Sequence, residues 1–279
     1  MGHGPRARAG DVMSTLDDVL SDLTAESVQL DQWVAGLAEP AWATVTTPEG
    51  WTVTDQIAHL HWTDTASLTA LQEPEAFAEM LRAAASDPTG FVDAQSAETA
   101  LIPPGDLLMV WREGRVELDA ALRDVPDGEK VPWFGPPMSP ASMATARIME
   151  TWAHGHDIGE ALGITIPTTS RARHVCHIGV RARGYAYLVH GETDPGVDVR
   201  VELTGPDGDL WTWGPADADE RVTGSGHDFA LLATRRRHLD DVDVVAHGEH
   251  AAHWLSIVQA FAGMPGADPV RLADRGDRP

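Results

Sequence analysis

Apolar side chains recur every three or four residues in the first part of the chain, which is the spacing of one face of an α-helix. The first such stripe consists of Leu16, Leu20, Leu23, Leu30, Val34 and Leu37. Pro40 and the segment Thr46-Thr-Pro-Glu-Gly50 then interrupt the pattern, because proline and glycine break helices. The pattern predicts an amphipathic helix of about six turns.

Three more long helices are predicted before residue 167. They run from Thr52 or Thr54, either of which can serve as the cap, to Leu71, over 106–123, and over 140–163, and a shorter helical piece covers 74–86. The last long helix has Ser139 as its N-cap, Pro140 at its first position and Gly163 as its stop. Four long helices joined by loops predict a helix bundle.

After Pro167 the pattern changes to shorter, mixed elements. Val197, Val199, Val201 and Leu203 alternate strictly with other residues, as in a half-buried strand. The other predicted elements are helices over 171–189, 225–234 and 249–261 and strands over 210–213 and 242–246. The fold class predicted is therefore an all-α domain followed by a small α+β domain. The expected divisions are a disordered extension (1–12), the bundle (13–166), the α+β domain (167–265) and a disordered tail (266–279).

Composition narrows the classes of partner. The 43 acidic and 20 basic residues give a formal charge of -23, which disfavours binding to nucleic acid and to anionic membranes. No apolar run approaches the roughly 20 residues of a membrane span. A single cysteine, Cys176, excludes an intramolecular disulfide and is typical of a reducing cytoplasm. We expect a cytoplasmic protein, monomeric or homodimeric, that acts on a small molecule.

One face of the fourth long helix is unusually polar for a bundle. Met143, Arg147, Glu150, His154, Asp157 and Ala161 lie on one stripe, and buried charge is costly unless it is paired or bound to metal. Glu150 and His154 are four residues apart and share a face. His59, on the second helix, is the predicted third ligand. The donor set suits Zn²⁺, and also Ni²⁺, Fe²⁺ or Mn²⁺.

Each of these residues also has a simpler interpretation. Glu150 and His154 can form a helix-surface pair worth a few tenths of a kcal/mol. Arg147 can bind a substrate carboxylate or neutralise Glu150. Asp157, one turn after His154, can orient that imidazole or be an exposed charge. His61 and His156 lie about 200° around their helices from His59 and His154, so we place both outside the ligand set.

The motifs resemble those of the DinB-like metalloprotein superfamily, in particular the amino-terminal domain of mycothiol-dependent maleylpyruvate isomerases. The matching segments are Gly50-Trp-Thr-Val-Thr-Asp-Gln-Ile-Ala-His59-Leu and Arg147-Ile-Met-Glu150-Thr-Trp-Ala-His154-Gly-His-Asp157-Ile. The resemblance implies a four-helix bundle in which His59, Glu150 and His154 bind zinc. It also implies that mycothiol, a low-molecular-weight thiol of actinobacteria, supplies the nucleophile.

Nearly the whole chain resembles a set of actinobacterial two-domain metal-binding proteins. The resemblance includes His177-Ile-Gly-Val-Arg-Ala-Arg183, Trp211-Thr-Trp-Gly-Pro215, Asp228-Phe-Ala-Leu-Leu-Ala-Thr-Arg-Arg-Arg237 and Trp254-Leu-Ser-Ile-Val-Gln-Ala-Phe-Ala-Gly263. It implies a second domain of the sterol-carrier-protein type. One departure concerns an arginine that often ends the closing helix of the isomerases, because Gln259-Ala-Phe-Ala-Gly263 has none. Arg235, Arg236 and Arg237 can replace it, or form a solvated or phosphate-binding run.

Three functions are compatible with the sequence. The first is a metal-dependent transferase or isomerase that activates mycothiol toward a small electrophile, with Trp62, Trp133 and Phe134 as the wall of an apolar pocket. The second is a thiol-independent metalloenzyme, such as a Lewis-acid lyase, cyclase or hydrolase of specialised metabolism. The third is a non-catalytic protein that binds metal or a small ligand. The resemblance favours the first.

Overall fold

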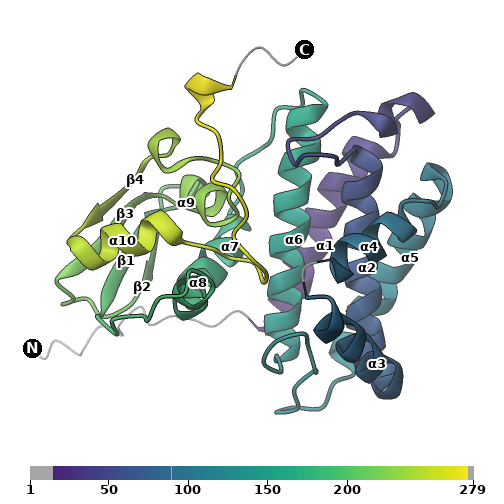
Figure 1. The fold of residues 1–279 in the computed structure, drawn as a ribbon, viewed down its shortest axis with the longest axis horizontal. Helices are drawn as coiled ribbons and strands as arrows, with labels where there is room; N and C mark the ends of the chain where they lie inside the picture. The colour runs from purple at the N-terminus through teal and green to yellow at the C-terminus, as the bar shows by residue number, and fades with distance from the viewer. Residues whose placement is uncertain (1–14, 89, 276–279) are drawn as a thin grey trace, which may run out of the picture.

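The computed structural model describes residues 15–88 and 90–275, which form two units side by side (Figure 1). The first unit is a helical bundle, and the second is a four-stranded sheet with helices packed against it. The predicted fold class, a helical bundle followed by a small α+β domain, is confirmed. The predicted disordered extension at 1–12 and the last four residues of the predicted tail lie outside the described residues.

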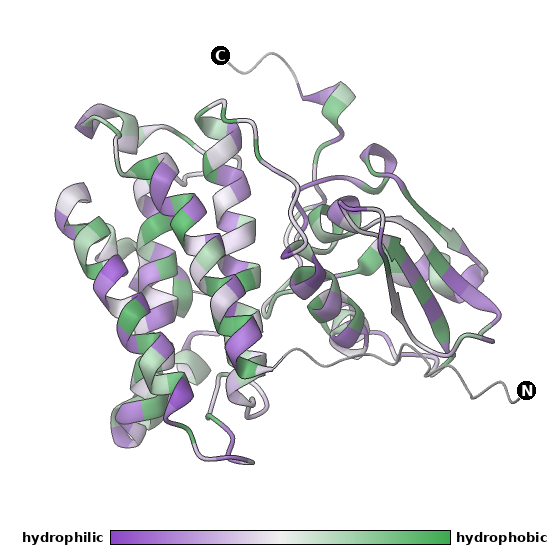
Figure 2. Cartoon of the chain, turned by 180° about the vertical axis from the view of Figure 1, so that it is seen from behind, coloured by the Kyte–Doolittle hydropathy of each residue, from purple (hydrophilic) through white to green (hydrophobic). Residues whose placement is uncertain are grey.

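The helical unit is built from long amphipathic helices with defined starts. Its elements are α1 (Leu16–Val34), η1 (Glu39–Ala43), α2 (Val53–Gln72), α3 (Pro74–Ser86), α4 (Phe91–Thr99), α5 (Pro104–Arg123) and α6 (Pro140–Ala161). Of the two predicted caps for α2, Thr52 is used, and it forms a capping box with Asp55. Ser139 caps α6 and Pro140 is its first residue, as predicted. Figure 2 shows hydrophobic and hydrophilic residues alternating around these helices, which is the pattern that buries one face.

One helix of this unit was not predicted. α4 lies between two segments that contain the helix-breaking residues proline and glycine, Asp87-Pro-Thr-Gly90 and Ile102-Pro-Pro-Gly105. Its sequence mixes polar and apolar residues without a clear stripe, and among its residues only Ser96 is buried. α4 packs against α2, and this contact brings Ser96 to the candidate site described below.

The second unit contains a mixed sheet with the strand order β2-β1-β3-β4. Its elements are α7 (Ala172–Arg181), α8 (Arg183–Val189), β1 (Val199–Thr204), β2 (Leu210–Trp213), β3 (Glu220–Ser225), α9 (Gly226–Ala233), η2 (Leu239–Asp241), β4 (Val244–His247) and α10 (Glu249–Ile257). β1 pairs parallel to β3, and the two outer pairings are antiparallel. The predicted helix over 171–189 is divided at Ala182, and α10 ends four residues earlier than expected.

The central strand β3 was missed because its sequence carries little strand signal. Val222 is its only buried residue, so no apolar alternation is visible. Gly224 adopts φ +145°, and a Cβ at this position would lie 2.1 Å from the carbonyl oxygen of Asp243. The glycine therefore permits the close approach of β3 to the segment that leads into β4.

α6 belongs to the cores of both units. Its residues Met143, Ala144 and Ile148 pack inside the bundle, whereas Met149, Trp152 and Ala153 join the core formed by the sheet, α7, α9 and α10. In Figure 1, α6 is the bundle helix that faces the α+β unit. The predicted boundary near residue 167 stays a prediction, because the packing around α6 is continuous across it.

Part of the predicted tail is placed against the α+β unit. Leu272, the first residue of η3 (Leu272–Asp274), donates its backbone N–H to the Asp241 carboxylate, and Arg271, just before η3, forms an ion pair with Asp240. These contacts place Arg271 and Leu272 beside η2, and the expected disorder of the tail stays a prediction. Within residues 15–88 and 90–275, no helix combines the length and the apolar character needed to cross a bilayer.

Candidate metal centre

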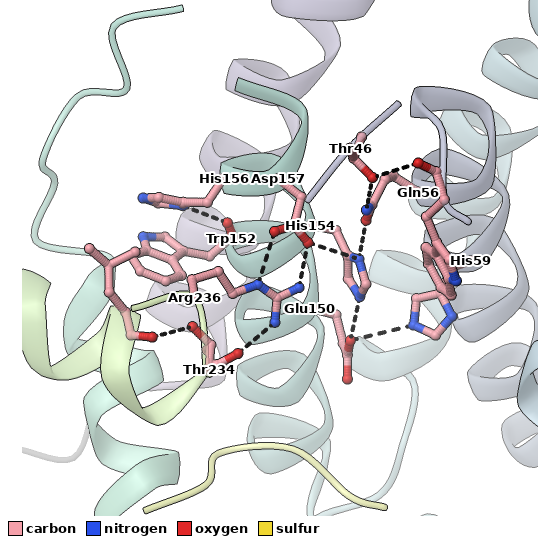
Figure 3. A network of polar contacts seen from close by, with 12 residues as sticks. Thr46, Gln56, His59, Glu150, Trp152, His154, His156, Asp157, Thr234 and Arg236 are labelled. Atoms are coloured by element: carbon pink, nitrogen blue, oxygen red, sulfur yellow. Dashed lines mark hydrogen bonds and ion pairs between the residues drawn. The ribbon is translucent and has the colours of Figure 1, made fainter. Parts of the chain in front are cut away.

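Two helices supply the three predicted ligand side chains. His59 lies on α2, and Glu150 and His154 lie one turn apart on α6, with their side chains directed toward one another (Figure 3). Glu150 Oε2 lies 3.3 Å from His154 Nε2 and 3.5 Å from His59 Nε2. One ligand atom of each residue lies within 4.8 Å of the other two. The fold thus brings the two motifs to one point.

The spacing of these atoms fits a single divalent ion. In a tetrahedral zinc site with bonds of roughly 2.0–2.1 Å, neighbouring ligand atoms lie about 3.3–3.4 Å apart. Both distances from Glu150 Oε2 are close to this value. Two imidazole nitrogens and one carboxylate oxygen can all offer electron pairs to the same point. Three protein ligands would leave a coordination position for a further ligand.

Burial and neighbouring charges set the protonation of the site. The side chains of His59 and His154 are 11% exposed and that of Glu150 is 18% exposed. Burial lowers the pKa of His154 to about 4, and the charges of His59 and Arg236 act in the same direction. Burial alone would raise the pKa of Glu150, but a hydrogen bond with His59 and the charge of Arg147 hold it well below its usual value. A neutral imidazole and an ionised carboxylate are the forms that bind metal.

Each ligand imidazole has a polar partner at its other nitrogen. His154 Nδ1 is hydrogen-bonded to Gln56 Oε1, and His59 Nδ1 lies 3.1 Å from Ser96 Oγ. The sequence did not predict either partner. The available signal for Gln56 was its position one turn before His59 on the same helix face. No signal pointed to Ser96, because its role depends on the packing of α4 against α2.

Asp157 has neither of the two roles that its spacing allowed, because it does not orient His154 and its side chain is buried rather than exposed. Its Oδ2 lies 3.9 Å from His154 Nδ1, which is beyond hydrogen-bond distance, and Gln56 is bonded to that nitrogen instead. The Asp157 carboxylate accepts hydrogen bonds from Arg236, at 3.3 Å from Nε and 2.6 Å from Nη2. Asp157 is therefore half of a largely buried ion pair that joins α6 to the α+β unit.

The neighbouring arginines of the α+β unit are paired as well. Arg235 binds Asp268, and Arg237 binds Glu160 near the end of α6. The run of three arginines is therefore not a solvated one. Arg236 and Arg237 form ion pairs that link the α+β unit to α6, the helix that carries Glu150 and His154.

Arg147 lies one turn before Glu150 and is almost completely buried. Its guanidinium carbon lies 5.2 Å from the centre of the Trp133 ring. Its Nε and Nη1 have no hydrogen-bond partner in the described part of the chain. A buried cation with two unused donors next to the ligand set has the chemistry needed to bind an anion.

Aromatic rings surround the two ligand imidazoles. Trp51 stacks on His154 with ring centres 5.7 Å apart and an angle of 15° between the planes, and Trp62 lies 6.4 Å from His59. Trp62 also contacts Phe134, whose ring contacts that of Trp133. The three residues predicted to line a pocket, Trp62, Trp133 and Phe134, therefore form one cluster that extends from His59 toward Arg147. That they line a substrate pocket stays a prediction.

The neighbouring histidines lie outside the group of three. His61 lies beside Gly114 of α5. His156 Nδ1 lies 2.8 Å from the carbonyl oxygen of Trp152, and its ring contacts that of His227 in the α+β unit. Both imidazoles thus point away from Glu150, which agrees with their positions around the two helices.

Two protein-family models match parts of this chain. A model described as the mycothiol maleylpyruvate isomerase N-terminal domain matches residues 23–159, which contain all three candidate ligands. A model described as wyosine base formation matches residues 195–247, which contain the four-stranded sheet. The predicted likeness of the second unit to sterol carrier proteins stays a prediction.

Two curated proteins and two crystal structures are similar to this chain. Two Mycobacterium tuberculosis proteins, from two strains and both described as uncharacterized, are 53% identical over 247 residues, which are 88% of this chain and 96% of each relative. Crystal structures of the mycothiol-dependent maleylpyruvate isomerase and of one of its mutants match with a TM-score of 0.55 and 16% identity. They cover 85% of this chain and 96% of the isomerase chain. At this identity the likeness is one of fold.

Proposed function

The chain belongs to the same family as the two Mycobacterium tuberculosis proteins, and its helical unit carries the mycothiol maleylpyruvate isomerase N-terminal domain; from this premise we propose that it is a divalent-metal-dependent enzyme. Its co-substrate is a low-molecular-weight thiol, mycothiol, and its substrate is a small electrophile. The observation that carries the proposal is the convergence of His59, Glu150 and His154 within the segment matched by the isomerase domain.

His59, Glu150 and His154 would hold the ion. The two distances from Glu150 Oε2 suit Zn²⁺, and the donor set also accepts Ni²⁺, Fe²⁺ or Mn²⁺. A bound divalent ion lowers the pKa of a thiol enough to form the thiolate at neutral pH. The protein's own thiol is unsuited to this task, because Cys176 is buried, donates to the carbonyl oxygen of Gly226 and has a pKa raised by burial. The nucleophile must therefore come from a second molecule.

The surrounding residues have separate roles in this proposal. Trp51 and Trp62 restrict water around the thiolate, and Arg147 holds an anionic end of the substrate. The thiolate adds to an electrophilic carbon, so that a C–S bond forms and the electron pair of the C=C bond moves toward a conjugated carbonyl. Rotation and expulsion of the thiolate give a cis-trans isomer. Protonation of the neighbouring carbon instead gives a thioether, with the proton supplied by the original thiol.

Thiol dependence is the central test of this function. We expect mycothiol to produce a thiolate-to-cobalt absorption band when it is added to the Co²⁺-substituted protein, because the open coordination position is available to sulfur. We also expect the metal-loaded protein to accelerate loss of a conjugated electrophile only when mycothiol is present. Absorption spectroscopy and chromatography of the products measure the two effects.

Cys176→Ser is the control for this experiment. Both the absorption band and the thiol-dependent turnover should survive the substitution, because Cys176 is buried in the other unit. Turnover without any thiol would contradict the proposal and favour the thiol-independent metalloenzyme. A loss of turnover in correctly folded Cys176→Ser would show that the protein supplies its own nucleophile.

Arg147→Met is expected to weaken the binding of small carboxylates by about 10- to 100-fold, because a hydrogen bond to a charged group is worth roughly 1.5–3 kcal/mol. Methionine keeps the apolar stem against Trp133 and removes the donors. Isothermal titration of the metal-loaded protein with a short unsaturated dicarboxylate measures the effect. The free energy of unfolding should change little, because losing the attraction between Arg147 and Glu150 is offset by removing a buried cation with two donors that have no partner within residues 15–88 and 90–275.

The matched control is Arg112→Met. Arg112 also lies on a bundle helix, but it is half-exposed and pairs with Asp31 on the surface. Its removal should leave carboxylate binding unchanged. Equal carboxylate affinities in wild type and Arg147→Met would exclude Arg147 from substrate binding.

A further inference from the structure

A line of hydrogen bonds connects the backbone of the Thr44–Val53 segment to the ring of His154 (Figure 3). The carbonyl oxygen of Trp51 accepts from the Thr46 hydroxyl at 3.0 Å. Thr46 Oγ1 accepts in turn from Gln56 Nε2 at 2.8 Å. Gln56 Oε1 is bonded to His154 Nδ1. None of these bonds includes the side of His154 that faces Glu150.

The Trp51 carbonyl oxygen determines which atom is the donor and which is the acceptor in every hydrogen bond of this line. A carbonyl oxygen can only accept, so the single hydroxyl hydrogen of Thr46 is committed to Trp51. Thr46 can therefore only accept from Gln56, which places the amide nitrogen of Gln56 on that side and its oxygen toward His154. Because this oxygen also only accepts, His154 must carry its hydrogen on Nδ1. The electron pair of the neutral ring is then on Nε2, 3.3 Å from Glu150.

We propose that Thr46 and Gln56 are positioning residues that hold His154 in the Nδ1–H tautomer and thereby keep its Nε2 free to bind the metal ion. The inference rests on the metal site of the proposed function, and it does not depend on the thiol or the substrate. Hydrogen bonds at the second nitrogen of a ligand histidine orient the ring and raise its affinity for metal.

The local structure keeps this line intact. Gln56 is completely buried and Thr46 is 4% exposed, so water has little access to replace either partner. Thr46 N also donates to the Trp51 carbonyl oxygen at 2.8 Å, and Gly50 adopts φ +80° in the turn between them. The turn therefore fixes the carbonyl on which the direction of the hydrogen bonds depends.

His59 lacks an equivalent constraint. Its Nδ1 partner, Ser96 Oγ, can donate or accept because a hydroxyl rotates to suit its neighbour. Ser96 therefore holds the ring of His59 in place without selecting its tautomer. Of the two ligand histidines, only His154 has its tautomer fixed by the backbone.

Two substitutions test the inference. Gln56→Met removes the acceptor while keeping the volume, and Thr46→Val removes the hydroxyl that orients Gln56 without touching His154. We expect Gln56→Met to weaken Zn²⁺ binding by about 10- to 100-fold and Thr46→Val to weaken it less. Thr46→Ser should restore wild-type affinity. Competition with a chromophoric chelator measures the affinities, and long-range ¹H–¹⁵N NMR of the metal-free protein reports the tautomer of His154.

Gln259→Met is the matched control, because Gln259 is also completely buried and hydrogen-bonded but lies in the α+β unit. It should leave both Zn²⁺ affinity and the His154 tautomer unchanged. Wild-type protein with hydrogen on Nε2 of His154, or unchanged Zn²⁺ affinity in both Gln56→Met and Thr46→Val, would overturn the inference. Failure of the wild type to bind Zn²⁺ would instead overturn the proposed function. The tautomer of His154 would still test whether Thr46 and Gln56 orient its ring.

Discussion

Replacement of His59, Glu150 and His154 by alanine together is expected to abolish metal binding while the helical fold survives. The three side chains supply every predicted ligand, and one atom of each lies within 4.8 Å of the others. The groups next to them are the Gln56 amide and the Ser96 hydroxyl, which are poor ligands for Zn²⁺, and the Asp157 carboxylate, which is paired with Arg236. We expect roughly one divalent ion per wild-type chain and none in the variant.

The fold should tolerate this change because the removed groups interact mainly with one another. Removing all members of a buried polar cluster lowers the free energy of unfolding far less than removing one member and leaving the others without a partner. The orphaned acceptor on Gln56 would cost about 1–3 kcal/mol, and water in the enlarged polar site can reduce that cost. Elemental analysis of protein purified without an affinity tag measures the metal, and circular dichroism measures the helix content.

A second triple variant controls for adventitious metal bound by histidine. His247, His250 and His253 are exposed in the α+β unit, and their joint replacement by alanine should leave the metal content unchanged. The absence of metal from the wild type, even after reconstitution, would reduce the ligand triad to a polar cluster. The non-catalytic ligand-binding interpretation would then become the leading one.

The ligand triad could be predicted because its signal is local. Glu150 and His154 share a helix face by their spacing alone, and His59 lies in a segment that resembles a known metal-binding motif. The structure places one ligand atom of each together, although binding of metal stays a prediction. The helical bundle could also be predicted from the sequence, because long apolar stripes with clear caps determine its helices.

The partners of the ligands could not be predicted because they depend on contacts between distant segments. Asp157 has the correct spacing to reach His154, yet Arg236 from the other unit engages its carboxylate. Gln56, rather than Asp157, is hydrogen-bonded to His154 Nδ1. Ser96 contacts His59 from α4, a helix that was not predicted because proline and glycine flank it and it has no clear apolar stripe. The periodicity of a sequence describes one helix at a time. It does not indicate which side chain of another element will bind a given carboxylate.

α6 connects the candidate site to the α+β unit in this chain. Its Glu150 and His154 face α2 and form the candidate site, while Met149, Trp152 and Ala153 pack into the α+β core. The ion pairs of Asp157 and Glu160 with Arg236 and Arg237 extend this second contact. The helix that carries two ligands is therefore also the helix that the α+β unit holds in place.

Trp152→Ala is accordingly expected to lower the free energy of unfolding by about 3–5 kcal/mol, the usual cost of removing a buried aromatic side chain. The Trp152 ring is 2% exposed. It contacts His156 with ring centres 3.8 Å apart and His227 of the α+β unit at 5.7 Å. The cavity would open between α6 and the α+β unit. Chemical denaturation followed by circular dichroism and tryptophan fluorescence measures the change.

The position of Trp152 predicts that this loss of stability is separable from metal binding. Because its side chain lies on the opposite side of α6 from the ligands, folded Trp152→Ala should still bind the ion at saturating metal concentration. Leu188→Ala is the control, since Leu188 is 68% exposed in the α+β unit and surface changes usually stay within about 0.5 kcal/mol. A cost below about 1 kcal/mol for Trp152→Ala would be too small for a ring that fills the joint core of the two units. Loss of metal from the folded variant would instead show that the α+β unit supports the ligand geometry directly through α6.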